Sequence, residues 1–289
     1  MSVLEISAFS DGARGGNPAG VWLGDALPPA ERMQAIAAEV GHSETVFASP
    51  EGTGWRARYF SPAMEVPFCG HATIALGAAL ALSHGNGVFP LVLNDAEITV
   101  EGRASDGVLT AALMSPPTAH RALPHDRLAQ YLRLFGYAES DLDAGVAPAV
   151  VHAGADHLLI PLASRAALGR LDYALDDGAA LMHEDQLITV LFTVADGPGV
   201  FWCRNAFAVG GVKEDPATGA AAAALVGYLR DAALSALQVF ELKQGDDMGM
   251  PSRLRVECST VPGSAVRVAG AARLMRAPEP AHEGVSAVV

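Results

Sequence analysis

The chain has 289 residues, of which 51% are hydrophobic and 18% charged, a composition typical of a globular protein with a large buried core. The 19 lysine and arginine residues against 32 acidic residues give a formal net charge of −13, which argues against a nucleic acid or an anionic membrane as the partner. A small anionic ligand remains compatible with this charge, because backbone N–H groups can bind one locally, and the length suits two domains of roughly 130–150 residues.

The first part of the chain predicts one amphipathic helix, one small apolar helix and several strands. Residues 29–40 place apolar side chains on one face of a helix, and Gly41 suits its end. The small apolar helix follows Cys69. Strands are expected at 3–9, 21–23, 42–47, 55–60, 88–93, 97–100 and 107–113. Residues 115–118, with two consecutive prolines, form the best linker in the chain.

The second part of the chain predicts a similar mixture of strands and helices. Helices are expected near 124–135, 163–172 and 219–232. Strands are expected near 148–152, 157–161, 187–193, 200–208, 237–243, 253–258 and 265–271. We therefore expect two domains, 1–116 and 117–275, and a flexible tail at 276–289. The strand near 265–275 could pack against the first domain.

One motif occurs in both parts of the chain. The first copy begins at Arg58, and the second at Arg204. Eleven positions later come Cys69-Gly70-His71-Ala72-Thr73 in the first copy and Asp215-Pro216-Ala217-Thr218-Gly219-Ala220 in the second. Each copy predicts a strand, a tight turn and a helix of small residues. The two copies indicate two similar halves that face one another.

The two turns are candidates for an anion site. A helix N-terminus offers N–H groups without helical partners and a partial positive charge, which together bind a carboxylate or phosphate. Gly70 and Gly219 leave the backbone open to a ligand, and Thr73 and Thr218 offer hydroxyl groups. Ordinary helix capping would also explain one such turn. Two copies at matching offsets favour the functional interpretation.

Three groups could carry protons at this site. Cys69 and Asp215 occupy equivalent places in the two copies, as a pair of acid/base groups in an epimerase would. The position of Cys69 before a helix predicts a lowered thiol pKa, although a buried inert thiol is equally compatible. Glu44, in the strand expected at 42–47, could face a half-buried space, or it could be a solvated carboxylate. His71 shares the expected anion site.

Several strings, taken in order, resemble the PhzF-like family of phenazine biosynthesis proteins. They are Gly16-Asn17-Pro18-Ala19-Gly20-Val21, Ser43-Glu44-Thr45-Val46-Phe47, Arg58-Tyr59-Phe60-Ser61-Pro62, Cys69-Gly70-His71-Ala72-Thr73, Glu214-Asp215-Pro216-Ala217-Thr218-Gly219 and the turn Gln244-Gly245 to Pro251-Ser252. The resemblance implies an α+β fold of the diaminopimelate epimerase type, with two pseudo-symmetric domains. Each domain would wrap a mostly antiparallel sheet around a central helix. It also implies cofactor-free isomerisation of a small carboxylic acid in a homodimer.

The resemblance assigns roles to particular residues. Glu44 would be the general acid/base, completed by His71 and Asp215. The residues expected to bind substrate are Asn17, Ser43, Gly70, Ala72, Thr218, Gly219 and Ala220. Ala220 and Met250 depart from the family, which has a serine at the first position and often a basic residue at the second. The serine's absence weakens the case for the phenazine precursor itself as substrate.

The sequence also bears on alternatives to an isomerase. A non-catalytic or regulatory protein could keep the fold and bind a small carboxylate, and Ala220 favours that alternative. A metal site has weak support, because His152, Asp156 and His157 form no standard ligand motif. Nucleotide-binding patterns do not occur. We therefore expect neither metal nor cofactor.

The sequence also bears on location. It begins without the basic and apolar segments of a secretory signal, and its apolar runs are shorter than the about 18 residues that suggest a membrane span. Its three cysteines, Cys69, Cys203 and Cys258, are odd in number and widely spaced. We expect a cytoplasmic protein with no membrane partner.

Overall fold

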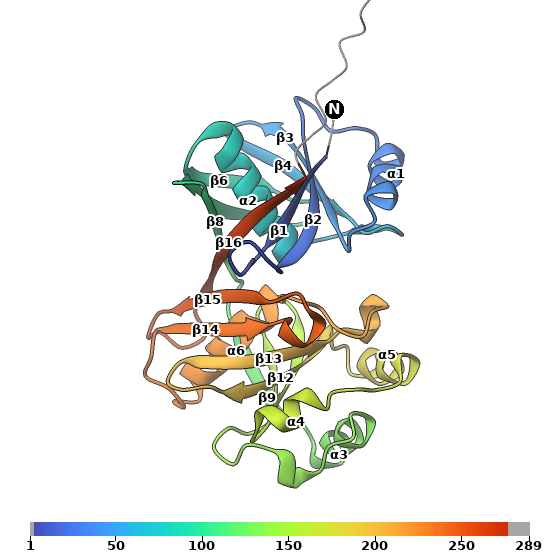
Figure 1. Cartoon of the computed structure of the whole chain (residues 1–289), viewed down its shortest axis with the longest axis vertical. Helices are drawn as coiled ribbons and strands as arrows, with labels where there is room; N and C mark the ends of the chain where they lie inside the picture. The colour runs from blue at the N-terminus through green and yellow to red at the C-terminus, as the bar shows by residue number, and fades with distance from the viewer. Residues whose placement is uncertain (1–2, 277–289) are drawn as a thin grey trace, which may run out of the picture.

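The computed structural model describes residues 3–276, in which one continuous sheet passes through both parts of the molecule (Figure 1). Its strand order is β1-β2-β3-β4-β6-β7-β8-β16-β15-β14-β13-β12-β11-β10-β9, and β5 pairs with β4. The strands in the first part are β1 (Leu4–Ala8), β2 (Asn17–Leu23), β3 (Thr45–Glu51), β4 (Gly54–Phe60), β5 (Glu65–Val66), β6 (Gly87–Val92), β7 (Glu97–Ser105) and β8 (Val108–Met114). The later strands are β9 (Ala119–Ala122), β10 (Ala149–His152), β11 (Asp156–Pro161), β12 (Thr189–Ala195), β13 (Val200–Ala206), β14 (Val239–Gln244), β15 (Ser252–Cys258) and β16 (Val266–Arg276).

Two of the helices, α2 and α6, form the centres of the two largest hydrophobic clusters. The helices are α1 (Ala30–Val40), α2 (Gly70–His84), α3 (His125–Leu134), α4 (Arg165–Gly169), α5 (Leu175–Glu184) and α6 (Gly219–Asp231). Residues 71–81 of α2 are all buried, against β7, β8 and β2. Residues 221–229 of α6 are likewise buried, against β15, β16 and β10. Their small side chains suit a helix that sheet covers on several sides.

Strand β16 connects the two parts of the sheet. It pairs with β15, through Val256 and Val268, and with β8, through Leu113 and the same Val268. Further along, Leu274 pairs with Ile6 of β1. Because β1 leads through β2, β3, β4, β6 and β7 back to β8, this strand closes a ring of strands around α2. Figure 1 shows β16 rising from β15 into the part that contains α1 and α2.

The structure contains most of the expected elements, shortens one helix and adds elements that were not expected. Helix α1 ends at Gly41, whose φ of 73° is the left-handed conformation expected of a helix end. The helix expected near 163–172 is shorter, covering only Arg165–Gly169. Helix α5 was missed because Gly178 lowers helix propensity, although the glycine lets the helix pack against the Tyr173 ring. Strand β9 was missed because its four residues are all exposed and show no alternation.

The domain boundary near residue 116 stays a prediction, and the expected tail lies outside the described residues apart from Arg276. Within residues 3–276, the structure has no helix with the length and apolarity to cross a membrane.

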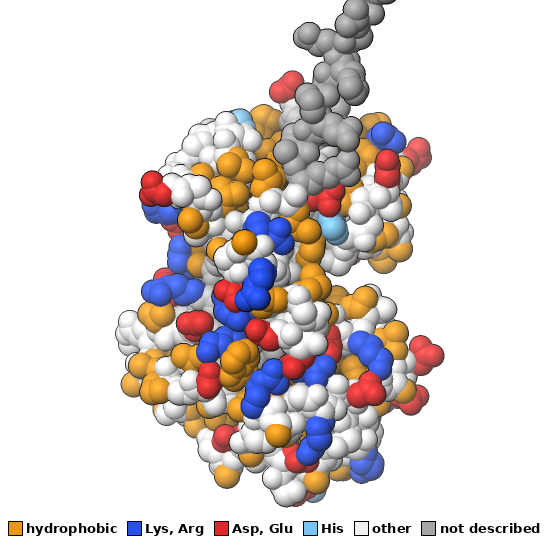
Figure 2. Space-filling model, viewed as in Figure 1, with side chains coloured by type: hydrophobic (Ala, Val, Ile, Leu, Met, Phe, Trp, Pro, Cys, Tyr) orange, Lys and Arg blue, Asp and Glu red, His pale blue; other side chains and the backbone are white. Residues whose placement is uncertain are grey.

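Acidic and basic side chains lie intermixed on the face shown in Figure 2. Ion pairs in the described part of the chain include Arg253 with Asp246 and Arg267 with Glu101.

Candidate active site

The expected site residues come together where α2 and α6 meet. Cys69 directly precedes α2, and Thr218 directly precedes α6. The two helices contact one another, and the charges of His71 and Asp215 influence each other across this contact. The N-termini of the two repeated helices therefore lie at one place, as the repeat predicted.

Glu44 lies at this place, just outside the strand in which it was expected. Strand β3 begins at Thr45, and the Glu44 carbonyl accepts a 3.1 Å hydrogen bond from the Gly20 N–H. The Glu44 side chain is 16% exposed, and its Oε2 lies 3.4 Å from His71 Nε2. Ser43 Oγ lies 3.3 Å from the same nitrogen. The segment before β3 thus brings a carboxylate and a hydroxyl group to one imidazole.

The thiol of Cys69 also contacts that imidazole, with Sγ 3.3 Å from His71 Nδ1 and 3.9 Å from Nε2. Burial raises the pKa of the thiol well above its ordinary value, and the charge of Glu44 raises it further. Of the two alternatives for Cys69, the lowered thiol pKa was therefore wrong, and the structure shows the buried thiol. The positive end of α2 is outweighed by the loss of solvent and by the carboxylates nearby.

Asp215 is held by side chains from both parts of the chain. Asn17 Nδ2, in β2, donates a 2.7 Å hydrogen bond to Asp215 Oδ1, and the Thr218 hydroxyl donates to Oδ2. Burial raises the pKa of the Asp215 carboxyl group, whereas the charge of His71 and these hydrogen bonds act to lower it. Glu44, Cys69 and Asp215 therefore surround His71 with groups that can be negatively charged.

Two residues that the sequence analysis did not assign support this arrangement. Gln244 Nε2 donates to the Asp215 carbonyl at 2.7 Å and to Thr218 Oγ1 at 3.2 Å. Asn205 Nδ2 also donates to Thr218 Oγ1. The repeat could have identified Asn205, because this residue directly follows Arg204 at the start of the second copy.

In the first copy of the repeat, the residue equivalent to Asn205 also bonds to a threonine hydroxyl group. Tyr59 follows Arg58, and its hydroxyl lies 2.8 Å from Thr73 Oγ1. Thr73 also donates to the Cys69 carbonyl at 2.7 Å. The Thr73 hydroxyl is therefore taken up inside the protein, so of the two uses expected for it, helix capping or ligand binding, it is not left free for a ligand.

The two arginines of the repeat stabilise the loops and do not reach the anion site. Arg58 forms a two-pronged ion pair with Glu65, through hydrogen bonds of 2.8 and 2.6 Å. Arg204 forms the same kind of pair with Glu214, the residue before Asp215. Arg204 also donates to the Leu168 carbonyl at 3.1 Å. Each pair ties a strand to the loop that leads into the site.

The expected carboxylate-binding residues differ in what they can offer. A Cβ on Gly70 would meet no heavy atom within 4 Å, so the backbone there faces open space. A Cβ on Gly219 would lie 3.6 Å from the Phe9 ring, in ordinary contact. The side chain of Ala72 is fully buried in the core, which leaves only its backbone for a ligand. Ala220 is half-buried and brings no polar side-chain atom.

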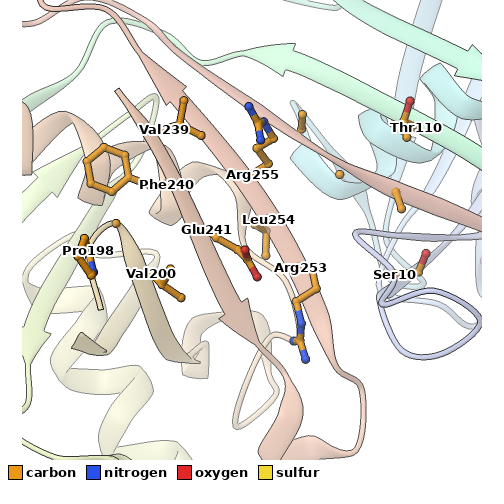
Figure 3. Close-up of a pocket in the computed structure, with 14 residues that line it drawn as sticks. Ser10, Thr110, Pro198, Val200, Val239, Phe240, Glu241, Arg253, Leu254 and Arg255 are labelled. Carbon is orange, nitrogen blue, oxygen red and sulfur yellow. The ribbon is translucent and has the colours of Figure 1, made fainter. Parts of the chain in front are cut away.

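A cavity of about 500 Å³ lies elsewhere, lined mainly by residues of β14, β15 and β16. Figure 3 shows Ser10, Glu241, Arg253 and Arg255 around it. None of the residues expected at the site lines it.

Comparison with known sequences gives relatives over nearly the whole chain. The family described as phenazine biosynthesis-like protein matches residues 6–277. An uncharacterized isomerase of Deinococcus radiodurans is 31% identical over 289 residues, covering 94% of this chain and 92% of the relative. A trans-2,3-dihydro-3-hydroxyanthranilate isomerase of Pseudomonas fluorescens is 33% identical over 253 residues, covering 86% of each protein.

Comparison with solved structures addresses the fold. A phenazine biosynthesis protein of the PhzF family from Bacillus anthracis gives a TM-score of 0.84 at 21% identity, covering 96% of this chain and 97% of the other. A probable proline racemase from Agrobacterium radiobacter gives a TM-score of 0.66 at 12% identity, covering 99% of this chain and 94% of the racemase. The sheet-rich α+β fold predicted from the sequence is thus the fold these proteins share.

Proposed function

Because the chain belongs to the phenazine biosynthesis-like family and is an isomerase, we propose that it moves a proton within a small carboxylic acid without a cofactor. Glu44 is the general acid/base, and His71 and Asp215 complete the catalytic set. The observation that carries this proposal is the 3.4 Å contact between Glu44 Oε2 and His71 Nε2, at the N-terminus of α2 and beside Asp215.

The proposed reaction starts with the substrate carboxylate at the two helix N-termini. Their N–H groups and partial positive charge favour an anion there. Glu44 removes a proton from a carbon near that carboxylate, and negative charge develops on the substrate. The same N–H groups stabilise this charge, which is the electrostatic contribution such sites make. Glu44 then returns the proton to a different carbon on the same face, so the electron pair shifts and no atom is lost.

The surrounding residues position these groups. His71, which contacts both Glu44 and Cys69, fixes the carboxylate of Glu44 by its Nε2. Asn17 and Thr218 hold the Asp215 carboxylate toward His71. The substrate-binding set we propose is Asn17, Ser43, Gly70, Ala72, Thr218, Gly219 and Ala220, used mainly through backbone groups.

The substrate class is a small carboxylic acid. The Pseudomonas fluorescens relative is named for trans-2,3-dihydro-3-hydroxyanthranilate, which is one compound to test. Ala220 offers no hydroxyl group where the phenazine enzyme has a serine. We therefore propose an acid whose recognition does not need that hydroxyl contact.

Hydrogen exchange tests the proposal directly. A panel of small carboxylic acids is incubated with the protein in deuterated water, and mass spectrometry measures the incorporated deuterium. We expect incorporation or isomerisation for at least one acid with wild-type protein, and a loss of about 100-fold or more with Glu44→Gln. Glu31→Gln, on the exposed part of α1, is the control and should keep full activity. Unchanged turnover by Glu44→Gln would show that another group carries the proton.

A non-catalytic carboxylate-binding protein is the second candidate, and Ala220 is the observation that favours it. Its signature is binding without chemistry. Calorimetry would then detect a small carboxylate bound at the helix N-termini, while no acid in the panel exchanges hydrogen. Exchange that Glu44→Gln abolishes excludes this candidate.

We further propose a cytoplasmic homodimer of two-domain subunits, divided near residue 116. The family resemblance supports the dimer and the two domains, and the three free cysteines fit a reducing compartment. Analytical ultracentrifugation tests the dimer. A monomer across the concentration range of the activity assay would contradict it.

A further inference from the structure

The backbone of Phe9 has a conformation that residues with side chains rarely adopt. Its φ is 60°, in the left-handed region that favours glycine, and the residue directly follows β1. For a bulky residue this conformation is strained, and it persists only where the surrounding structure holds it. Strain of this kind clusters at functional places in proteins, so the contacts of Phe9 indicate what it does.

Hydrogen bonds to two later strands hold this backbone. The Arg253 N–H of β15 donates to the Phe9 carbonyl at 2.8 Å, and the Ser10 N–H donates to the Ala271 carbonyl of β16 at 3.0 Å. Ile6, in β1, lies in the hydrophobic cluster around α2, whereas Phe9 lies in the cluster around α6. The chain therefore passes from one core into the other within three residues.

The ring of Phe9 stands between β16 and the first residue of α6. The side chain is fully buried. A Cβ on Gly270 of β16 would lie 2.5 Å from the ring atom Cδ1, so the ring needs a glycine there. A Cβ on Gly219, which begins α6, would lie 3.6 Å from Cζ at the end of the ring and 3.7 Å from Val268 of β16. The ring is thus a contact through which the first part of the chain reaches the start of α6.

The same end of β1 carries a second contact to this place. Ala8, the residue before Phe9, pairs with Asn17, whose side chain donates to Asp215 and to the Ala217 carbonyl. We propose that Phe9 is a positioning residue, whose ring sets where the N-terminus of α6 lies relative to the N-terminus of α2. The consequence for catalysis rests on the proposed function, in which the substrate carboxylate needs both helix N-termini at one place.

Phe9 does not belong to the proposed substrate-binding set, and it acts through Gly219. A smaller side chain leaves space beside β16 into which the start of α6 can move. The N–H groups of α6 then lie farther from the substrate carboxylate and from the negative charge that develops on the substrate. A misplacement of about 1 Å, caused by a change far from the chemistry, can lower the rate about 100-fold.

Phe9→Leu tests the proposal, and Phe240→Leu is the matched control. Phe240 is 2% exposed and lies in the same hydrophobic cluster, so both variants exchange a buried ring for a smaller side chain. Phe240 precedes Gln244, which reaches the site, by four positions in β14, or roughly 13 Å along the strand. Mass spectrometry of the ligand-free proteins measures backbone amide exchange. It should rise at least about tenfold at residues 219–226 in Phe9→Leu, and stay as in the wild type in Phe240→Leu.

The second measurement is the turnover of an acid that the screen of carboxylic acids identifies. We expect kcat/KM to fall at least about tenfold in Phe9→Leu, with a raised KM, and to change less than about twofold in Phe240→Leu. Each variant is assayed well below its melting temperature, so that lost stability does not lower the amount of folded protein. If Phe9→Leu does not fold, Phe9→Met takes its place, because the flexible methionine side chain fills irregular spaces.

The outcomes separate this proposal from the proposed function. Unchanged amide exchange at residues 219–226 in a folded Phe9 variant overturns the positioning role. An equal loss of kcat/KM in Phe9→Leu and Phe240→Leu also overturns it, because a merely structural role gives that result. If the wild type turns over no acid, the proposed isomerisation fails, and the amide exchange alone decides whether Phe9 positions α6.

Discussion

The side-chain amide of Asn17 donates a 2.7 Å hydrogen bond to the carboxylate of Asp215, joining β2 to the loop before α6. Asn17 also donates to the Ala217 carbonyl at 3.2 Å and is 3% exposed. A single buried amide therefore connects the two ends of the repeat at the point where α2 and α6 meet.

Replacing Asn17 should damage both stability and the site. Asn17→Ala leaves the Ala217 carbonyl and the Asp215 carboxylate each short of one donor, at a cost of about 1–3 kcal/mol in the free energy of unfolding. Asn17→Asp should cost more at neutral pH, because two carboxylates then face each other. Urea unfolding at several pH values measures this. In acid the Asn17→Asp defect should shrink as a carboxyl group regains a proton, and a defect that stays constant with pH would contradict the explanation.

The raised pKa of Asp215 predicts how stability depends on pH. Because burial raises this pKa, the folded protein binds the Asp215 proton more tightly than the unfolded chain does. The contribution is complete below the ordinary aspartate pKa of about 3.9 and is lost as pH rises through the higher native value. The stability of the wild type relative to Asp215→Asn should therefore fall across that window, by about 1.4 kcal/mol for each unit of pKa difference. Denaturant unfolding of both proteins at matched pH gives the difference. A stability difference between the two proteins that rises with pH would contradict the raised pKa.

The close approach of α2 to β7 predicts a large effect at Gly102. A Cβ there would stand 2.0 Å from the Gly77 carbonyl oxygen, so Gly102→Ala forces helix and strand apart. We expect a loss of at least about 1–3 kcal/mol in the free energy of unfolding. Gly87 is the matched control, because it pairs with Gly102 in the sheet and its Cβ would only touch the Phe89 ring at 3.6 Å. Thermal unfolding should separate the two variants, and equal melting temperatures would contradict the packing.

Gly70 offers a test of the proposed carboxylate site that leaves the fold intact. Its Cβ would enter open space, so Gly70→Ala should change the free energy of unfolding by less than about 0.5 kcal/mol. The added methyl group would nevertheless stand where the substrate carboxylate is proposed to bind. We expect hydrogen exchange on the identified acid to fall at least about tenfold, mainly through a higher KM. Full activity in a folded Gly70→Ala variant would place the carboxylate elsewhere.

Local pattern was enough to predict much of the fold, and the family resemblance supplied the membership of the candidate site. The helix ending at Gly41 and the two small-residue helices have signals within short stretches of sequence. The gathering of Glu44, His71 and Asp215 was expected from the ordered strings that resemble the family. The catalytic and binding roles of these residues stay predictions. The repeat was informative because two weak turn signals at the same offset support each other.

The parts that were missed depend on contacts between distant segments. The pKa of Cys69 is raised because burial and the charge of Glu44 act on it, and the contribution of Glu44 comes from a distant segment of the chain. The hydrogen bonds of Gln244 to Asp215 and Thr218 join residues from separate strands and loops. Helix α5, which the sequence did not predict, depends on Gly178 packing against Tyr173. This tertiary contact overrides the low helix propensity of glycine.

Strand β16 has a consequence for how the protein is made. It lies near the end of the chain, yet it pairs with both β1 and β8 and so closes the ring around α2. A nascent chain that has not yet reached residue 266 leaves these two strands with open edges, which other chains can pair with. Folding of the first half therefore waits for translation to approach its end. During this interval the incomplete ring is the state that chaperones must protect from aggregation.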